Sequence, residues 1–389
     1  MNERVESVDL LRGVVMVLMA LDHTRDFFGD AGVNPTNPAT TTAALFFTRW
    51  ITHVCAPTFF LLTGTGASLA RRRRSRAELS RFLLTRGLSL IAMEFAIARA
   101  GLQFNVDYRV TLLTVMWALG WSMIALAALV HLPAPAVTAI GVMLIATHNL
   151  ADPVRASAFG ALAPIWSLLH APNVVFDDSQ HVVFAAYPLI PWIGVTAAGY
   201  GLGEIYRWEA ARRQRVLLTL GVALTAAFVF LRAVNVYGDP VRWSAHASTA
   251  KTALSFLNAT KYPPSLLFLL MTLGPALLFL RAVDARTPAL LRPALVIGKV
   301  PLFYFLLHMP LIHLLAVISC YARYGHGQLH WIFESPTLAQ YPITQPPGWP
   351  LGLPAVYAIW IAVVVLMYPL CQWYAGVKRR QPHPALSYL

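Results

Sequence analysis

Charged residues and cysteines are scarce in this chain of 389 residues. Asp, Glu, Lys and Arg make up only 12% of it, against ~25% in soluble domains, whereas hydrophobic residues make up 57%. So few charges cannot cover a water-facing surface of this size, and the many aliphatic and aromatic residues exclude a disordered chain. The three cysteines, Cys55, Cys320 and Cys371, are too scattered for a disulfide framework or a zinc site. The composition therefore predicts a polytopic membrane protein.

Long apolar segments recur along the whole sequence. A membrane-crossing helix needs roughly 20 mostly apolar residues, and this window predicts an all-α membrane bundle of about ten transmembrane helices. The predicted spans are approximately 9–29, 44–70, 82–100, 111–131, 134–150, 181–203, 216–233, 264–281, 299–319 and 353–375. The stretch Phe159–His170 is predicted as a half-span or an interfacial helix. No linker separates a soluble part, so we expect one integral-membrane domain over residues 1–389.

The positions of the basic residues predict the orientation in the membrane. The net charge is +13, and most of the 30 Lys and Arg residues lie between spans on one side, including Arg71–Arg74 and Lys378–Arg380. Because basic loops stay in the cytoplasm, both termini are predicted to be cytoplasmic, in a bacterial inner membrane. Basic residues at membrane boundaries favour contact with anionic lipid, and no nucleic-acid-binding module accompanies them.

The first predicted helix carries ionisable residues, which are costly at membrane depth and indicate function. Asp9 and Arg12 are three residues apart and are expected to pair. Arg12 and His23 are eleven residues apart, so they share one face of the helix, about 16 Å apart along its axis. His23 could act as a general base or nucleophile, or could simply cap the helix. Asp22 points about 100° away from His23, so we expect it to pair with Arg25 or Asp26.

Further histidines lie in other predicted spans. His53 follows Arg49 by one turn and is either catalytic or a buried core histidine. His308 and His313 are about 140° apart around their helix, which is wrong for a shared metal, so we expect one of them to reach a cavity. No His, Cys or carboxylate cluster has metal-ligand spacing. Glu94 is expected to pair with an arginine of a neighbouring helix.

Five stretches of the sequence together resemble one family. They are Ser7–Gly13 with the apolar run to His23, Arg49–Pro57, Tyr187–Gly194, Phe256–Pro264 and Pro301–His308. In this order, at predicted helix ends, they resemble bacterial membrane proteins related to heparan-α-glucosaminide N-acetyltransferase. The spacing from Arg12 to His23 is also similar to that of membrane acyltransferases that modify sugars. The resemblance implies an acyl-CoA-dependent O- or N-acyltransferase, with acetyl-CoA or another acyl-CoA as donor and an extracytoplasmic sugar or glycan as acceptor.

The resemblance also implies roles for individual residues. In the lysosomal branch of the family, the catalytic histidine lies in the loop after the first helix. Residues Thr24–Thr52 contain no histidine, so the role falls on His23, on His53 or on neither. Cytoplasmic acyl-CoA would bring its phosphates near Arg12, because arginine donates bidentate hydrogen bonds to phosphate.

The remaining candidates have a functional and a structural interpretation. Arg71 and Arg72 could bind CoA phosphates, or could act only as a stop-transfer signal that contacts lipid. Asn258, Lys261 and Tyr262 could bind the acceptor together with His308 and His313, or could form a helix-entry turn. Small residues are typical of close helix contacts, which we expect at Gly64, Gly66, Gly194, Gly199 and Gly203.

A different class of function fits the same residues. In a multi-pass transporter or scaffold without acyl transfer, Arg12, His23, Glu94 and His308 would line a proton or solute path. Such proteins often contain repeated halves with broken helices, and the sequence shows no repeat. Whether the chain forms a homo-oligomer is left open by the sequence.

Overall fold

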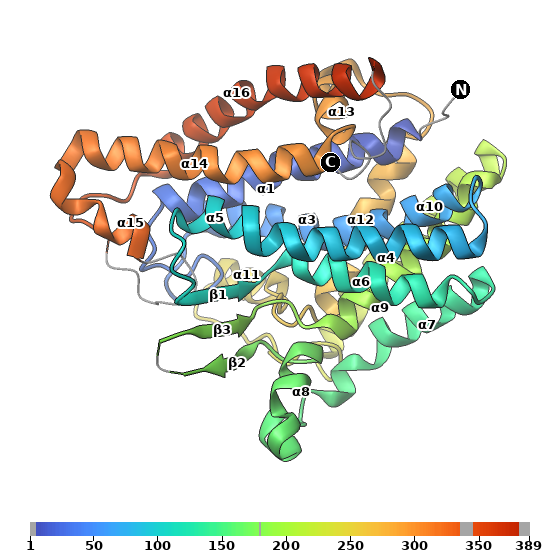
Figure 1. The fold of residues 1–389 in the computed structure, drawn as a ribbon. Helices are drawn as coiled ribbons and strands as arrows, with labels where there is room; N and C mark the ends of the chain where they lie inside the picture. The colour runs from blue at the N-terminus through green and yellow to red at the C-terminus, as the bar shows by residue number, and fades with distance from the viewer. Residues whose placement is uncertain (1–4, 179, 335–344, 381–389) are drawn as a thin grey trace. The chain divides into compact units, whose positions relative to one another are not determined.

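The fold is mostly helical in the computed structural model, which describes residues 5–178, 180–334 and 345–380. This confirms a helical membrane protein. The chain forms two compact units, shown as a ribbon in Figure 1. Unit 1 comprises Met1–Cys55, Phe95–Tyr108 and Thr287–Leu389, and unit 2 comprises Ala56–Glu94 and Arg109–Arg286. That residues 1–389 act as one domain stays a prediction.

Unit 1 combines the first helix with helices from the C-terminal part of the chain. Its helices are α1 (Glu6–Phe28), α2 (Ala43–Ile51), η1 (Thr52–Val54), α5 (Arg99–Gln103), η6 (Ala289–Leu291), α13 (Arg292–Gly298), α14 (Pro301–Tyr324), η7 (His326–Gln328), α15 (His330–Glu334) and α16 (Leu353–Arg380). Helix α1 packs against α13, α14 and α16 (Figure 1). Unit 1 is therefore built from segments about 290 residues apart in sequence.

Unit 2 holds the helices of the middle of the chain. They are α3 (Cys55–Arg71), α4 (Arg76–Met93), α6 (Val115–Leu129), α7 (Ala134–Thr147), η3 (His148–Ala151), η4 (Ala156–Leu162), α8 (Ala163–Leu169), α9 (Leu189–Glu204), η5 (Ile205–Arg207), α10 (Ala210–Val234), α11 (Thr249–Leu257) and α12 (Leu266–Val283). The π-helix η2 (Glu94–Ala98) follows α4. The main packed pairs are α4 with α6, α7 with α9, and α10 with α12.

A small sheet in unit 2 departs from the all-α prediction. Strand β3 (Val182–Ala185) lies between β1 (Val110–Leu113), which is parallel to it, and β2 (Asn173–Asp177), which is antiparallel. Strands β1 and β3 occupy the first residues of the predicted spans 111–131 and 181–203. A hydropathy window cannot distinguish a short apolar strand from the start of a helix, and both strands are rich in β-branched residues.

Six helical segments in the described part of the chain are long and apolar enough to cross a membrane. They are Ala43–Arg71, Ala134–Ala151, Ala210–Val234, Leu266–Val283, Pro301–Tyr324 and Leu353–Arg380. Each of the other predicted spans also contains a helix, but these helices are shorter or carry more charge. Six candidate spans are thus shown, while ten spans and cytoplasmic termini stay predictions.

Serine and glutamate fix the start of α4. The Ser75 hydroxyl accepts a hydrogen bond from Glu78 N, and the Glu78 carboxylate accepts one from Ser75 N at 2.7 Å. This reciprocal capping satisfies two main-chain donors at the helix start. The pKa of Glu78 is lowered from its ordinary value, chiefly by the hydrogen bond from the Ser75 N–H and next by that of the Ser75 hydroxyl.

Glycine permits the closest helix contact in unit 1. A Cβ on Gly13 of α1 would overlap the Ala294 carbonyl of α13, and a Cβ on Gly298 would overlap the Asp9 carbonyl. The two backbones therefore touch directly, as in membrane helix pairs with small residues at the interface. In unit 2, Gly64 of α3 and Gly199 of α9 meet in the same way, as predicted. The prediction for Gly66 is wrong, since a Cβ there would have open space around it.

The carbonyls at the end of α1 accept hydrogen bonds from a C-terminal segment of unit 1. The carbonyls of Phe27 and Gly29 accept hydrogen bonds from Trp349 Nε1 and Gln345 Nε2, both at 3.0 Å. The Phe28 carbonyl accepts one from Leu351 N at 2.8 Å. The last carbonyls of a helix have no partner within it, so residues 345–351 supply what α1 lacks.

We expect Gly13→Ala to destabilise the protein, because the added methyl group overlaps main-chain atoms that cannot rotate away. The free energy of unfolding should fall by about 1–3 kcal/mol, as for other overpacked sites. Thermal unfolding of the purified protein in detergent measures the change. Gly66→Ala is the matched control, and should be neutral or stabilising by up to about 1 kcal/mol. Equal unfolding temperatures for the two variants would contradict the close contact.

Candidate functional site

Arg12 and Asp9 form the predicted ion pair near the start of α1. Nη1 of Arg12 lies 2.8 Å from Oδ1 of Asp9, and the Arg12 side chain is 22% exposed. A guanidinium has five N–H donors, so this pair leaves Arg12 able to donate to an anion as well.

Ionic contacts surround the last turn of α1. Asp22 accepts a hydrogen bond from Arg25 at 3.1 Å, which confirms the predicted pairing, and a second from Arg49 of α2. His23 instead faces Asp26, with its Nδ1 3.8 Å from Oδ2 and its side chain 25% exposed. His23 is therefore partly accessible and lies beside a carboxylate of its own helix.

The ring beside His23 belongs to His308 of α14. The two ring centres are 5.4 Å apart, and His308 is completely buried. Its Nδ1 lies 3.0 Å from the Tyr304 carbonyl and 2.8 Å from the Phe305 carbonyl. A carbonyl only accepts, so Nδ1 carries the proton in neutral His308 and Nε2 carries the lone pair. This Nε2 has no hydrogen-bond partner among the described residues.

His313 lies five residues further along α14, among aromatic rings. Its ring stacks on Phe104 with centres 3.9 Å apart and lies 4.8 Å from Phe27 of α1. Its Nδ1 donates to the Gly101 carbonyl at 3.3 Å. Phe104 has a φ of 49°, which is uncommon outside glycine and asparagine. Since His23 meets His308 and Phe27 meets His313, α1 and α14 run in parallel.

His53 also lies in unit 1, within η1, and is 3% exposed. Helix α1 packs on η1, and the Cys55 thiol donates to the Val15 carbonyl at 3.3 Å. These contacts hold His53 beside the first helix. Its proposed catalytic role stays a prediction.

The arginines predicted to bind CoA in unit 2 contact main-chain carbonyls. Arg71 donates to the Arg74 carbonyl at 2.7 Å, and Arg72 donates to the Tyr206 carbonyl at 2.8 Å. Such contacts satisfy the free carbonyls after a helix end. A role in phosphate binding stays a prediction for both residues.

Lys261 and Tyr262 form the turn that the sequence offered as the alternative to binding. Lys261 pairs with Pro264 in an isolated β-bridge before α12. Its ammonium lies 5.1 Å from the centre of the Tyr262 ring, a cation–π distance. The Tyr262 ring is 40% exposed and lies edge-on to Tyr187, with centres 5.4 Å apart. The turn thus presents an aromatic surface next to a cation.

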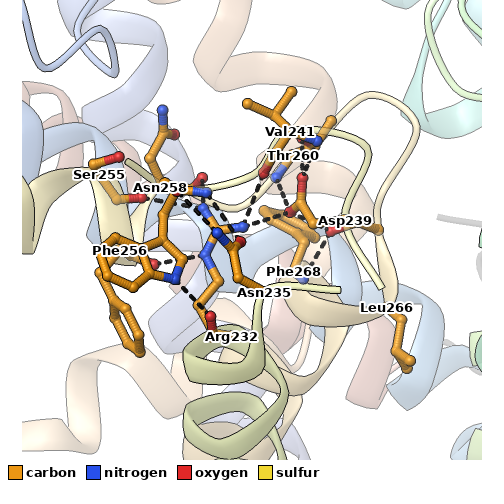
Figure 2. Close-up of polar contacts among 12 residues, drawn as sticks. Arg232, Asn235, Asp239, Val241, Ser255, Phe256, Asn258, Thr260, Leu266 and Phe268 are labelled. Atoms are coloured by element: carbon orange, nitrogen blue, oxygen red, sulfur yellow. Dashed lines mark hydrogen bonds and ion pairs between the residues drawn. The ribbon is translucent and has the colours of Figure 1, made fainter. Parts of the chain in front are cut away.

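Asn258 takes part in a buried network that the sequence did not predict. At its centre is Arg232 of α10, which is 1% exposed and lies 3.7 Å from Asp239. Its donors reach four main-chain carbonyls at 2.8–3.1 Å, those of Val241, Ser255, Phe256 and Asn258 (Figure 2). Asp239 accepts hydrogen bonds from Thr260 and Ser265. The network fixes the loop that leads to Lys261 and Tyr262.

The prediction that Glu94 pairs with an arginine is wrong. Its carboxylate accepts hydrogen bonds from the Thr114 hydroxyl at 2.7 Å, Met116 N at 3.0 Å and Trp117 N at 3.1 Å. The unpaired N–H groups at the start of α6 give the carboxylate donors without a cation.

A histidine–aspartate pair in unit 2 was also missed. Nε2 of the buried His170 lies 3.1 Å from Asp152, whose other oxygen accepts a hydrogen bond from Asn149 at 2.9 Å. His170 and Asp152 are 18 residues apart and no single helix contains both, so helical spacing could not relate them.

The predicted site residues divide between the two units. Unit 1 contains Arg12, His23, His53, His308 and His313, and unit 2 contains Arg71, Arg72, Asn258, Lys261 and Tyr262. Within the described ranges, no group of three or more His, Cys, Asp or Glu side chains is arranged to hold a metal ion.

Comparison with known proteins gives one family match. Residues 4–236 match the family model of the catalytic domain of heparan-alpha-glucosaminide N-acetyltransferase. The match covers α1 with His23 and all of unit 2 up to the end of α10. It ends before α14, which carries His308 and His313. No curated protein matches the chain.

We expect Arg232→Lys to loosen the loop between α10 and α12. A lysine ammonium cannot reach four separate carbonyls, and each buried carbonyl left without a donor costs about 1–3 kcal/mol. Hydrogen exchange of residues 239–258 should become faster, and the unfolding temperature should fall. Arg215→Lys, on the exposed face of the same helix, is the control and should change neither. Unchanged exchange in Arg232→Lys would show that the network does not hold the loop.

Proposed function

The chain belongs to the heparan-alpha-glucosaminide N-acetyltransferase family, and we propose that it is a membrane-embedded acyltransferase. It would transfer an acetyl or other acyl group from cytoplasmic acyl-CoA to a hydroxyl or amine of an extracytoplasmic sugar or glycan. We further propose that it lies in a plasma membrane with both termini in the cytoplasm.

The observation that carries the proposal is the state of His23. It lies near the end of α1, inside the matched residues, with Nδ1 facing Asp26 and its side chain partly exposed. A general base needs a free nitrogen within reach of the acceptor. His23 would take the proton from the acceptor as the new bond to the acyl carbon forms. The CoA sulfur then leaves with the bonding electrons and takes up a proton. His53 is the second candidate for this base.

Arg12 is the proposed contact for the CoA phosphates. Its side chain is partly exposed, and it lies eleven residues before His23 on the same helix. This separation is about 16 Å, so one helix would hold a phosphate contact and a base at the two ends of an extended donor. Arg71 and Arg72 stay proposed secondary contacts.

Tyr262 is the proposed acceptor contact of unit 2, with Lys261 and Asn258 beside it. An exposed aromatic ring offers an apolar face to a sugar ring, and the nearby ammonium offers donors to its hydroxyls. The Arg232 network and the Tyr187 ring hold this surface in place.

The direct test is acyl transfer by the purified protein. We expect labelled acetyl groups to move from acetyl-CoA to glucosamine, which offers both an amine and hydroxyls. Free CoA at a hundred times its dissociation constant should stabilise the folded protein by about 2.7 kcal/mol. Absence of both transfer and stabilisation, together with solute flux in vesicles, would favour the transporter instead.

His23→Ala should lower the turnover rate by about 10²- to 10⁴-fold, the usual contribution of a general base. The stabilisation by CoA should persist, because the substitution leaves Arg12 in place. His131→Ala, which removes an exposed histidine of unit 2, is the control and should keep full activity. Full activity of His23→Ala would transfer the proposed role to His53.

Tyr262→Ala should raise the KM for the sugar acceptor about 10-fold while leaving the KM for acetyl-CoA unchanged. Loss of one aromatic stacking contact of ~1 kcal/mol or slightly more accounts for such a factor. Steady-state kinetics with each substrate varied in turn measure the two constants. Tyr321→Ala, which removes another exposed ring, is the control. Equal effects on both KM values would argue against an acceptor site at Tyr262.

A further inference from the structure

His308 has an environment that neither the family match nor the proposed function explains. It lies on α14, outside residues 4–236, yet its ring is 5.4 Å from that of His23. The two histidines differ in exposure, since the His23 side chain is 25% exposed and His308 is fully buried. The pair therefore joins an accessible imidazole to one shielded from solvent.

The hydrogen bonds of His308 define which nitrogen can react. Nδ1 donates to carbonyls of its own helix, those of Tyr304 and Phe305. The ring is thereby fixed with Nε2 directed away from the backbone of α14. A buried nitrogen without a partner costs free energy, and a leucine or phenylalanine would fill the same space without that cost. Packing alone does not account for an imidazole here.

Acyl transfer requires two proton transfers, which one imidazole can perform in turn or two imidazoles can divide. One proton leaves the acceptor hydroxyl or amine when the acyl bond forms. One proton must reach the CoA sulfur, because a departing thiolate is otherwise a basic anion in an apolar site. The base that takes the first proton lies beside the acceptor, and this position does not by itself place it beside the CoA sulfur. Two neighbouring imidazoles can divide these two tasks.

We propose that His308 is the proton carrier between His23 and the leaving sulfur of CoA, an inference that rests on the proposed function. His23 takes the proton from the acceptor, and Nε2 of His308 receives it, directly or through one water molecule. His308 then gives this proton to the thiolate and returns to its neutral form. One proton leaves the acceptor and one reaches the sulfur, so no other reactant is needed.

His313 shows which feature of His308 matters. Both histidines lie on α14, and both donate from Nδ1 to a main-chain carbonyl. The ring contacts of His313 are with Phe104, Phe27 and Phe333, none of which can exchange a proton. Proximity to His23, rather than the buried tautomer alone, identifies His308 as the carrier.

The test is His308→Asn, because the asparagine amide nitrogen takes the position of Nδ1 and keeps the hydrogen bond to the helix carbonyls. It has no basic nitrogen in place of Nε2. We expect kcat to fall about 100-fold, within the usual range for proton transfer, with the KM for acetyl-CoA unchanged. The solvent deuterium isotope effect on kcat should rise, because proton transfer becomes rate-limiting. His326→Asn, at an exposed histidine of unit 1, is the control and should match the wild type.

Stabilisation by CoA, measured on the same samples, reports whether each variant is folded. A His308→Asn protein that is stabilised by CoA and retains the wild-type kcat would overturn the proton-carrier role. So would a lower kcat with an unchanged isotope effect, since a packing defect does not slow proton transfer selectively. If the wild type itself transfers no acetyl group, the proposed function fails first. Wild-type transfer with an unaffected His308→Asn variant refutes the carrier alone.

Discussion

The free carbonyls at the end of α1 are the constraint on which unit 1 depends. The last carbonyls of a helix need donors from outside it, and distant residues supply them for Phe27, Phe28 and Gly29. Gln345, Trp349 and Leu351 do so, from a segment more than 300 residues later in the chain. His23 lies about one turn before Phe27, whose carbonyl accepts the hydrogen bond from Trp349. The segment that closes the helix therefore also fixes the backbone that carries the proposed base.

The residues that match the family model do not include all the elements that support His23. Residues 4–236 include α1 and His23, but they lack α13, α14 and α16, which pack on α1 in unit 1. They also lack the glycine at position 298, where α13 meets the backbone of α1. The C-terminal helices α13, α14 and α16 therefore cover faces of α1 that no element of the matched region covers in their place. The chemistry proposed for His23 thus requires the C-terminal part of the chain.

Local spacing in the sequence predicted local contacts well. The pairs Asp9 with Arg12 and Asp22 with Arg25 follow from helical geometry, which the sequence reveals directly. Contacts between distant segments could not be predicted in this way. Glu94 was assigned a cationic partner because the sequence does not show which helix start faces a buried acid. The contact between the rings of His23 and His308 likewise joins distant segments, so no local spacing reveals it.

His308 and His23 each have contacts within their own helices that bear on how the two rings meet. His308 is oriented by carbonyls of its own helix, so any structure that forms α14 also orients its ring. His23 lies 3.8 Å from the Asp26 carboxylate on α1, whose end the C-terminal segment holds. The hydrogen bonds of His308 leave its Nε2 as a proton acceptor, and groups oriented in advance contribute strongly to catalytic electrostatics. Burial of this unpartnered nitrogen costs free energy, which the packing of unit 1 as a whole has to offset. The transporter alternative would place His23 and His308 along a solute path, whereas the proposed acyltransferase uses the two rings for proton transfer.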